Sequence, residues 1–352
     1  MSRLTRREKE ILEYLKQEPM ISQEELAAKL QISRSAAAVH ISNLMRKGYI
    51  LGRGYIFNER SGILVIGKVW LEIEVDCDKP EKSSGRIKVR YGGIGYDLVS
   101  ELSEFKTETT LLTVLGRDEV GDQVFEKLSQ KGINTNHILR ESASSTAKKV
   151  IVKNHQDSVL EVNDSGIHDH LNQSLLETKE ELIRTSQVVL IDGTLPFQVI
   201  DFILSKTEKY NILTSVIGCS LNLLQQRNRF SCQQLFLVCR QEELERLTKG
   251  GFQENDPENM ISVCRKLVKE GLNAFVVLLR DQRVVLATKD DVGYIPVLPS
   301  QAVRSPLSLL AGIAAGLASG YGMRPAVRRA LGPRLPGKQK KEKRFSLTTQ
   351  GM

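Results

Sequence analysis

Short apolar runs alternate with amphipathic segments along most of this chain, and this alternation restricts the fold more than any other feature. The first run, 63–67, reads Ile-Leu-Val-Ile-Gly and predicts a buried strand that ends at a glycine. Further strands are predicted at 110–114, 149–153, 187–192, 211–216, 235–238 and 274–279. Amphipathic helices are predicted between many of them, for example at 121–131 and 256–270. The pattern favours an α/β domain with a mostly parallel sheet and helices on both faces.

Size and composition fit one large domain and one small one. The 352 residues include 41% hydrophobic ones, which is enough for a packed core. The five cysteines form no Cys-x-x-Cys pair, so they indicate neither a zinc site nor a disulfide framework. No apolar run approaches about 18 residues, and the N-terminus has no apolar signal segment. We therefore expect a cytoplasmic protein that makes no contact with a membrane.

The net charge of +8 is concentrated at the two ends of the chain. Residues 1–60 hold 11 Lys and Arg against 7 Asp and Glu, and residues 324–352 hold 9 against 1. The 263 residues between them hold 30 against 34 and are mildly acidic. Basic ends on an acidic middle indicate anionic partners for the ends.

The first 60 residues follow the plan of a winged helix-turn-helix. A helix is predicted over 5–17 and ends before Pro19, and Ser22 with Glu25 forms a capping box that opens a second helix. Ser33 can cap a third helix that runs to about Lys47. Residues 48–57 then predict two short strands around a Gly-Arg-Gly tip. Three helices followed by a basic hairpin resemble the winged helix-turn-helix regulators.

The third helix is the expected recognition helix, which would lie in the major groove of DNA. The side chains predicted to read base edges are Arg34, Ser35, Ala38 and His40. Those predicted to contact phosphates are Arg46, Lys47 and Arg53 of the wing. The alternative is a small solvated helical bundle used only for dimer contacts. Pattern, charge sign and wing together favour DNA binding.

An ordered series of motifs in the larger domain resembles the ribokinase-like (pfkB) carbohydrate kinases. The series contains a Gly-Gly motif at 91–97, a Gly-x-Asp-x-x-Gly segment at 116–121, and further matches at 145–147, 159–164 and 192–196. The resemblance covers nearly all of 63–331 and is nearest to pseudouridine or nucleoside kinases with a fused helix-turn-helix. It implies a ribokinase-like fold and a hairpin lid within 75–90 that closes over the substrate and can pair two chains.

The resemblance also implies which residues would bind a substrate. Glu72 stands where the family has an Asp that grips sugar hydroxyls, and Asp97 stands where it has an Asn. Gly92 and Gly93 form the glycine pair. Both carboxylates can still accept hydrogen bonds from hydroxyl groups. A sugar or nucleoside is therefore the expected ligand.

The catalytic loop of the family is not retained. Aligning its Ala-Gly ending on Ala311 and Gly312 places Leu307 at the general-base position, and Arg304, Ser305 and Pro306 where the family has Gly-Ala-Gly. Leucine cannot accept a proton, and Pro306 has no N–H to offer a phosphate. We therefore expect no catalytic residue here.

The motifs that bind the nucleotide and Mg²⁺ in the family are not retained either. The family's Asn-x-x-Glu motif, which organises Mg²⁺, appears here as Arg-Gln-Glu-Glu at 240–243. Only its glutamate, Glu243, is retained. Arg240 replaces the asparagine and is expected to form an ion pair with Glu243. The family's Thr-Leu-Gly turn corresponds to Leu-Leu-Arg at 278–280. The family's final helix is replaced by a basic tail at 332–352, which is expected to be disordered.

The sequence therefore predicts a winged helix-turn-helix in 1–60, a degenerate kinase domain in 61–331 and the basic tail. The leading hypothesis is a homodimeric, DNA-binding transcriptional regulator without a cofactor, whose kinase-like domain senses a sugar or nucleoside or only dimerises. The alternative is an active pseudouridine or carbohydrate kinase that uses ATP and Mg²⁺. No metal site is expected, because 168–170 (His-Asp-His) has no further ligands nearby and predicts a solvated turn.

Overall fold

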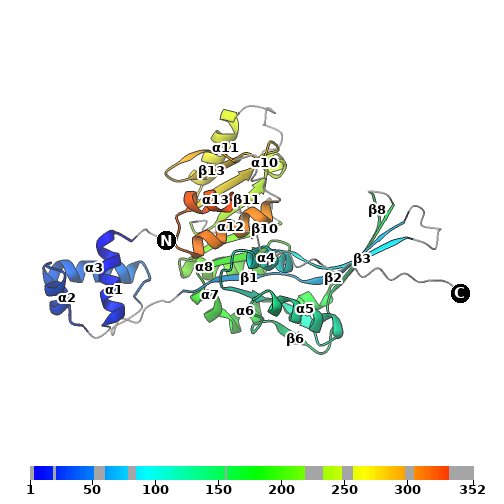
Figure 1. Cartoon of the computed structure of the whole chain (residues 1–352), viewed down its shortest axis with the longest axis horizontal. Helices are drawn as coiled ribbons and strands as arrows, with labels where there is room; N and C mark the ends of the chain where they lie inside the picture. Colours follow the sequence, from blue (N-terminus) through cyan, green and yellow to red (C-terminus); the bar gives the residue numbers. More distant parts are fainter. Residues whose placement is uncertain are drawn as a thin grey trace.

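The structure is a computed structural model that describes residues 4–18, 21–50, 60–77, 85–154, 157–218, 233–247, 257–297 and 305–332. Figure 1 shows a small helical unit at one end, a central layered domain, and a sheet that projects from the other end. The predicted wing tip and the basic tail at 333–352 lie outside the described residues.

The N-terminal unit contains α1 (Arg6–Gln17), α2 (Gln23–Lys29) and α3 (Arg34–Arg46). The predicted capping box opens α2, because Glu25 N–H donates to Ser22 Oγ at 3.1 Å and the Glu25 carboxylate accepts from Ser22 N–H at 2.9 Å. Ser33 caps α3 as predicted. Inward side chains of all three helices, including Ile11, Leu26, Ile41 and Leu44, form one buried cluster. Burial of this cluster holds the unit together.

The central sheet of the large domain is mostly parallel. One part has the strand order β10-β9-β1-β4, and its strands all run parallel. The other part has the order β11-β12-β13-β14, in which β11 and β12 are parallel and the later pairs antiparallel. The strands are β1 (Ile63–Ile66), β4 (Thr109–Leu112), β9 (Val188–Asp192), β10 (Leu213–Ile217), β11 (Phe236–Arg240), β12 (Ala274–Leu278), β13 (Val284–Thr288) and β14 (Val292–Ile295). A bridge between Thr214 and Leu235 joins the two parts.

Helices cover both faces of this sheet, as the sequence predicts. Alternate residues of β1 show the two layers, since Leu64 and Ile66 belong to one buried cluster and Ile63 and Val65 to the other. The helices are α4 (Ile94–Ser103), α5 (Glu119–Gln130), α6 (Gln173–Thr178), α7 (Glu180–Thr185), α8 (Phe197–Lys209), α10 (Gln241–Leu247), α11 (Pro257–Lys269), α12 (Pro306–Ala318) and α13 (Met323–Ala330). The short pair β5 (Val114–Gly116) and β6 (Leu139–Glu141) leads into and out of α5.

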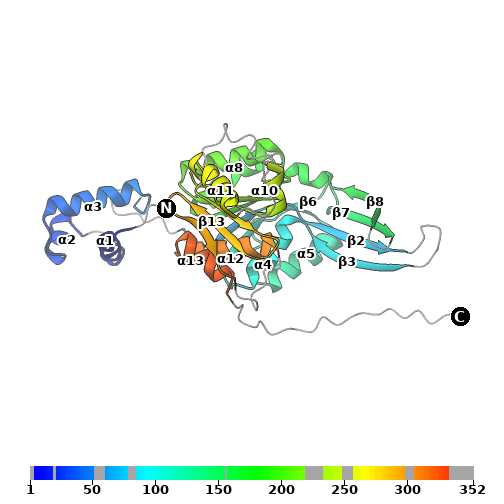
Figure 2. The same ribbon diagram turned by 90° about the horizontal axis from the view of Figure 1, so that it is seen from above.

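A separate sheet with the order β3-β2-β7-β8 projects from the large domain, as Figure 1 and Figure 2 show. Its strands are β2 (Trp70–Asp76), β3 (Arg86–Gly92), β7 (Lys148–Asn154) and β8 (Asp157–Asp164). The resemblance predicted a hairpin lid within 75–90, and β2 and β3 do pair there in antiparallel register. We call this structure the lid sheet.

The junction after the helical unit is anchored at Arg60. Its guanidinium donates to the carbonyl of Asn211 at 2.9 Å and also to that of Tyr210, at the C-terminal end of α8. Free carbonyls and the negative end of the helix dipole gather at such an end, so a cation is stabilised there. A Cβ atom on Gly48, just beyond α3, would lie 3.9 Å from Arg60 Nη2. Arg60 therefore lies against both domains.

Candidate ligand site and recognition helix

A glycine turn before α4 brings the ends of β1 and β9 together. Gly93 has φ of +101°, and a side chain there would collide with the carbonyl of Lys68. The carboxylate of Asp192 is fully buried, and it accepts hydrogen bonds from the N–H groups of Lys68 (3.0 Å) and Thr194 (2.9 Å). The turn is therefore rigid, and only glycine fits at its centre.

The predicted substrate residues lie together beside this turn. Glu72 on β2 is 5% exposed, and Arg90 on β3 lies directly opposite it in the register. Arg90 Nε donates to Glu72 Oε1 at 2.8 Å, and its Nη1 lies 3.8 Å from Asp97 Oδ1. A Cβ on Gly92 would come 3.5 Å from both the Arg90 and Glu72 side chains. Arg90, which the sequence analysis did not single out, therefore joins the two predicted carboxylates.

Burial changes the acidity of one of these carboxylates. It raises the pKa of Asp97, although the guanidinium of Arg90 opposes the rise. Trp70 also belongs to the cluster, because its indole Nε1 donates to Glu72 Oε2 at 3.3 Å. The cluster contains hydrogen-bond acceptors for hydroxyl groups, one cation and an aromatic ring, which is a suitable set for a polar, ring-bearing ligand.

The Gly-x-Asp-x-x-Gly segment has a structural role. Asp118 caps α5, since its carboxylate accepts from Gly121 N–H at 2.8 Å and from Thr146 N–H at 2.7 Å. Burial raises the pKa of Asp118, but the hydrogen bonds from Thr146 and Gly121 outweigh it and leave the pKa below its ordinary value. This carboxylate is used within the protein.

The expectation of a solvated turn at 168–170 was wrong for its first residue. His168 is 6% exposed, and its Nε2 lies 3.0 Å from the carbonyl oxygen of Val69. Burial lowers its pKa, so the ring is neutral at physiological pH. The burial of His168 could not be predicted from the sequence, because its neighbours are polar and a single buried histidine produces no periodic apolar pattern. No group of three metal-ligating side chains occurs among the described residues.

The segment that the sequence resemblance aligns with the family's catalytic loop forms the start of α12. Ser305 caps this helix, and its Oγ accepts the N–H of Ser308 at 3.1 Å. Pro306 is the first helical residue, where its missing N–H leaves no donor. Leu307 packs partly buried against the apolar cluster of the same layer. Of the N–H groups at this helix start, that of Pro306 is absent, and those of Ser308 and Leu309 are bound to Ser305 and so are not free for a phosphate.

The expected ion pair between Arg240 and Glu243 takes a different form. The carboxylate of Glu243 accepts the backbone N–H of Arg240 at 3.1 Å, at the start of α10. The ion pairs at this edge run from Arg280 to Glu242 (3.1 Å) and Glu245 (2.7 Å). Arg280 thus lies where the family has its Thr-Leu-Gly turn. These residues fit Mg²⁺ poorly, because Arg280 engages the carboxylates of Glu242 and Glu245, and Glu243 already accepts a backbone N–H.

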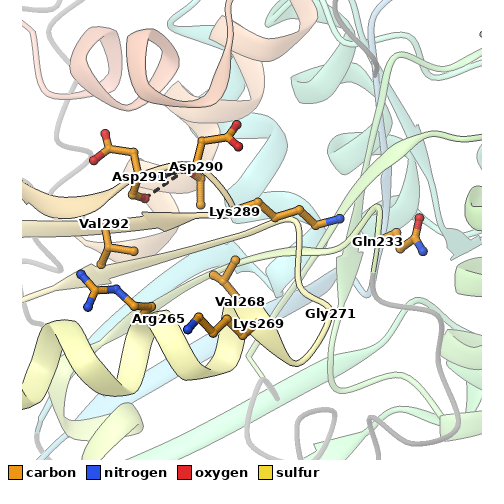
Figure 3. Close-up of a pocket in the computed structure, with 10 residues that line it drawn as sticks. Gln233, Arg265, Val268, Lys269, Gly271, Lys289, Asp290, Asp291 and Val292 are labelled. Carbon is orange, nitrogen blue, oxygen red and sulfur yellow. Dashed lines mark hydrogen bonds between the residues drawn. The ribbon is translucent and has the colours of Figure 1, made fainter.

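A cavity of about 560 Å³ opens at the other end of β12 from Arg280. It is lined by Gln233, Arg265, Val268, Lys269, Gly271, Thr288, Lys289, Asp290, Asp291 and Val292. Figure 3 shows the carboxylates of Asp290 and Asp291 pointing away from Lys289, and Asp291 pairs with Arg324 of α13. None of the residues of the ligand cluster lines this cavity, and no sequence motif indicated it.

Two of the four predicted base-reading side chains are exposed on the outward face of α3. Arg34 and Ser35 are exposed, and the side chain of Arg34 is 70% exposed. Ala38 and His40 are only half-buried positions, and His40 Nδ1 is fully buried. Val39 is 59% exposed and was not predicted. An exposed apolar side chain on a recognition helix can contact a thymine methyl group, so we add Val39 to the predicted base-reading residues, and the role of His40 stays a prediction.

Among the predicted phosphate-contacting residues, Arg46 is exposed and Lys47 is not free. Lys47 Nζ lies 2.7 Å from both carboxylate oxygens of Glu8, whose side chain is only 3% exposed. The pair joins α1 to the end of α3. Arg53 lies outside the described residues. We therefore remove Lys47 from the predicted DNA contacts and retain Arg46.

The ion pair between Lys47 and Glu8 should stabilise the helical unit. Lys47→Ala will leave the buried Glu8 carboxylate unpaired and lower the free energy of unfolding of the helical unit by about 3 kcal/mol. The hydrogen bond from Lys47 lowers the pKa of Glu8 from its ordinary 4.5, so the pair stabilises the unit above that pH and the effect is lost as the pH falls. Urea unfolding at neutral and acidic pH measures both effects. Arg46→Ala is the matched control and should leave stability unchanged; equal losses for the two variants would contradict the assignment.

None of the helices in the described ranges is both long and apolar enough to span a membrane.

Comparison with known proteins gives two family matches. The pfkB family of carbohydrate kinases matches residues 61–332, and the winged helix-turn-helix DNA-binding family matches residues 4–50.

Relatives agree with these matches. Over 337 residues the chain is 29% identical to a protein of Escherichia coli described as the uncharacterized sugar kinase YeiI, covering 93% of this chain and 92% of that protein. It is 19% identical to the E. coli pseudouridine kinase, over 62% of this chain and 70% of the enzyme. The structure of Arabidopsis thaliana ribokinase complexed with ribose and ATP superposes with a TM-score of 0.64 at 17% identity, covering 77% of this chain and 90% of that one. The chain thus belongs to the pfkB carbohydrate kinase family and carries an N-terminal winged helix-turn-helix domain.

Proposed function

We propose that this protein is a cytoplasmic, DNA-binding transcriptional regulator whose kinase-like domain binds a small sugar or nucleoside and pairs two chains, without transferring phosphate. The observation that carries the proposal is the start of α12. The sequence resemblance aligns Leu307 with the general base, and Ser305 caps the helix end at which Pro306 offers no N–H to a phosphate. A domain with this end closed can still bind a ligand on its other side.

The ligand side supports the sensing part of the proposal. Gly93 keeps the tight turn, and Glu72 and Asp97 keep carboxylate oxygens beside it. We propose that the protein uses neither ATP nor Mg²⁺, and two features support this: Arg280 pairs with Glu242 and Glu245, and Ser305 caps α12. The chemistry that remains is reversible binding of a polar molecule.

The lid sheet supports the pairing of two chains. Two rows of directly opposed apolar residues cross all its strands, and side chains opposite one another lie on the same face. The rows are Val89, Ile73, Val150, Val162 and Ile87, Val75, Val152, Leu160. Their outer members are strongly exposed, with Ile87 at 66% and Val89 at 61%. We propose that a second copy covers this apolar lid face, because a patch of this kind marks an interaction surface and the opposite face bears the ligand cluster.

DNA binding through α3 is the most direct test. Arg34→Ala should reduce discrimination between operator and random DNA by about tenfold or more, since a side chain that pairs with a base edge contributes specificity. Arg46→Ala should weaken binding to all sequences alike and reduce the salt dependence by about one phosphate contact. Fluorescence anisotropy over a salt series measures both.

Two further variants make this test decisive. Arg86→Ala, on the lid sheet, is the control and should change neither quantity. Removal of residues 333–352 tests the basic tail as an additional arm, which would lower affinity without lowering specificity. If that deletion abolishes binding while Arg34→Ala has no effect, recognition belongs to the tail and our assignment is wrong.

A further inference from the structure

The group that the ligand cluster presents to solvent is a cation. The Glu72 side chain is 7% exposed and that of Asp97 is 41% exposed, whereas that of Arg90 is 57% exposed. Glu72 already accepts from Arg90 and Trp70, one on each carboxylate oxygen. A molecule that enters this site therefore meets the guanidinium before it meets the most buried carboxylate.

The position of Arg90 follows from the strand register. Because Glu72 lies directly opposite Arg90 on one side and Lys149 on the other, all three occupy one face of the lid sheet. The ammonium of Lys149 lies 6.0 Å from the centre of the Trp70 ring and 2.8 Å from Glu161. Two cations thus flank one buried carboxylate. Glu72 holds Arg90 through Nε, although more than half of the Arg90 side chain is exposed.

We propose that the ligand of this cluster is an anionic sugar, whose carboxylate or phosphate binds Arg90 while its hydroxyl groups bind Asp97. This proposal rests on the ligand-sensing part of the proposed function and specifies its ligand class. A guanidinium presents parallel N–H donors that match two oxygens of a carboxylate or phosphate. Glu72 then acts as a positioning residue, since it orients the guanidinium through Nε.

Isothermal titration calorimetry on the full chain tests the proposal with two matched pairs. Gluconate against glucose isolates the carboxylate, and ribose 5-phosphate against ribose isolates the phosphate. At least one acid should bind about tenfold or more tightly than its neutral partner, as expected for a hydrogen bond between charged groups. Which acid binds identifies the anion.

Variants separate Arg90 from its surroundings. Arg90→Gln should remove the preference for the acid, so that the acid and its neutral partner bind with similar affinity. Arg86→Gln, on the same strand and the same face but opposite Asp76, should have no effect. Glu72→Gln keeps the shape of the site and an amide oxygen that can accept from Arg90 Nε, so the preference for the acid should be retained. Thermal unfolding of each variant verifies that it is folded.

Three results would overturn the proposal. Equal binding of acid and neutral sugar would remove the role of Arg90 while preserving the sensing function. Retention of the acid preference in a folded Arg90→Gln variant would assign the anion to another group. Lack of binding by all four compounds would remove both the anionic ligand and the sensing function, and would leave DNA binding, measured separately, as the remaining activity.

Discussion

Purified protein supplied with ATP and Mg²⁺ will phosphorylate ribose, pseudouridine and common nucleosides no faster than a protein-free control. A general base contributes about 10²- to 10⁴-fold to such reactions, and Leu307 cannot act as one. Each missing donor in an anion-binding site costs about a further 10²- to 10³-fold. ADP release in a coupled assay, with product detection by mass spectrometry, measures the rate.

Restoring the base alone should not restore activity. Leu307→Asp leaves Pro306 without an N–H and Ser308 bound to the Ser305 hydroxyl. A variant that also carries Ser305→Gly and Pro306→Ala opens the helix end and is the informative comparison. Turnover by the unmodified protein that disappears in Asp97→Ala would contradict our proposal and identify the chain as an active sugar or nucleoside kinase.

Disrupting the apolar lid face should have a similarly large effect on DNA binding. Val89→Asp places a charge in the row that a second copy would cover, so the protein should become monomeric in analytical ultracentrifugation. Two linked recognition helices bind a two-fold site about 10²- to 10⁴-fold more tightly than either alone, and this advantage should be lost. Anisotropy with an operator and with a half-site measures the loss.

The neighbouring residue of the same strand provides the control. Lys88 lies on the opposite face of the lid sheet, next to Glu74 at 3.5 Å. Lys88→Gln should therefore remain dimeric and bind the operator normally. If Val89→Asp also stays dimeric, the two chains pair elsewhere, and the exposed valine and isoleucine rows need another explanation.

Features set by neighbours in the chain were predictable from the sequence. The Ser22 and Ser33 caps, the inward residues of α3 and the buried strands follow from local spacing, and the structure has them within a few residues of the predicted positions. The family resemblance placed Glu72 and Asp97 in one region. Both kinds of inference depend on short-range pattern or on motif order.

Contacts between distant segments were not predictable in the same way. Lys47 pairs with Glu8 across 39 positions, and Arg90 meets Glu72 across 18, because helix packing and strand register bring them together. His168 is buried by a contact with Val69, 99 positions away. A single sequence shows the charges of such residues but not their partners. Lys47 and His168 were therefore both expected to be exposed, although both side chains are largely buried.

The anchor at Arg60 limits how far the recognition helix can travel. Its guanidinium holds the chain to the end of α8, and the segment between Ile50 and Arg60 can extend over at most about 35 Å. One turn of DNA advances by a similar length, about 34 Å. If two chains pair through their lid sheets as proposed, their two Arg60 anchors are held at a fixed separation, and half-sites beyond one such reach of an anchor are inaccessible. The spacing between the half-sites of an operator would then report the distance between the two Arg60 residues of the dimer.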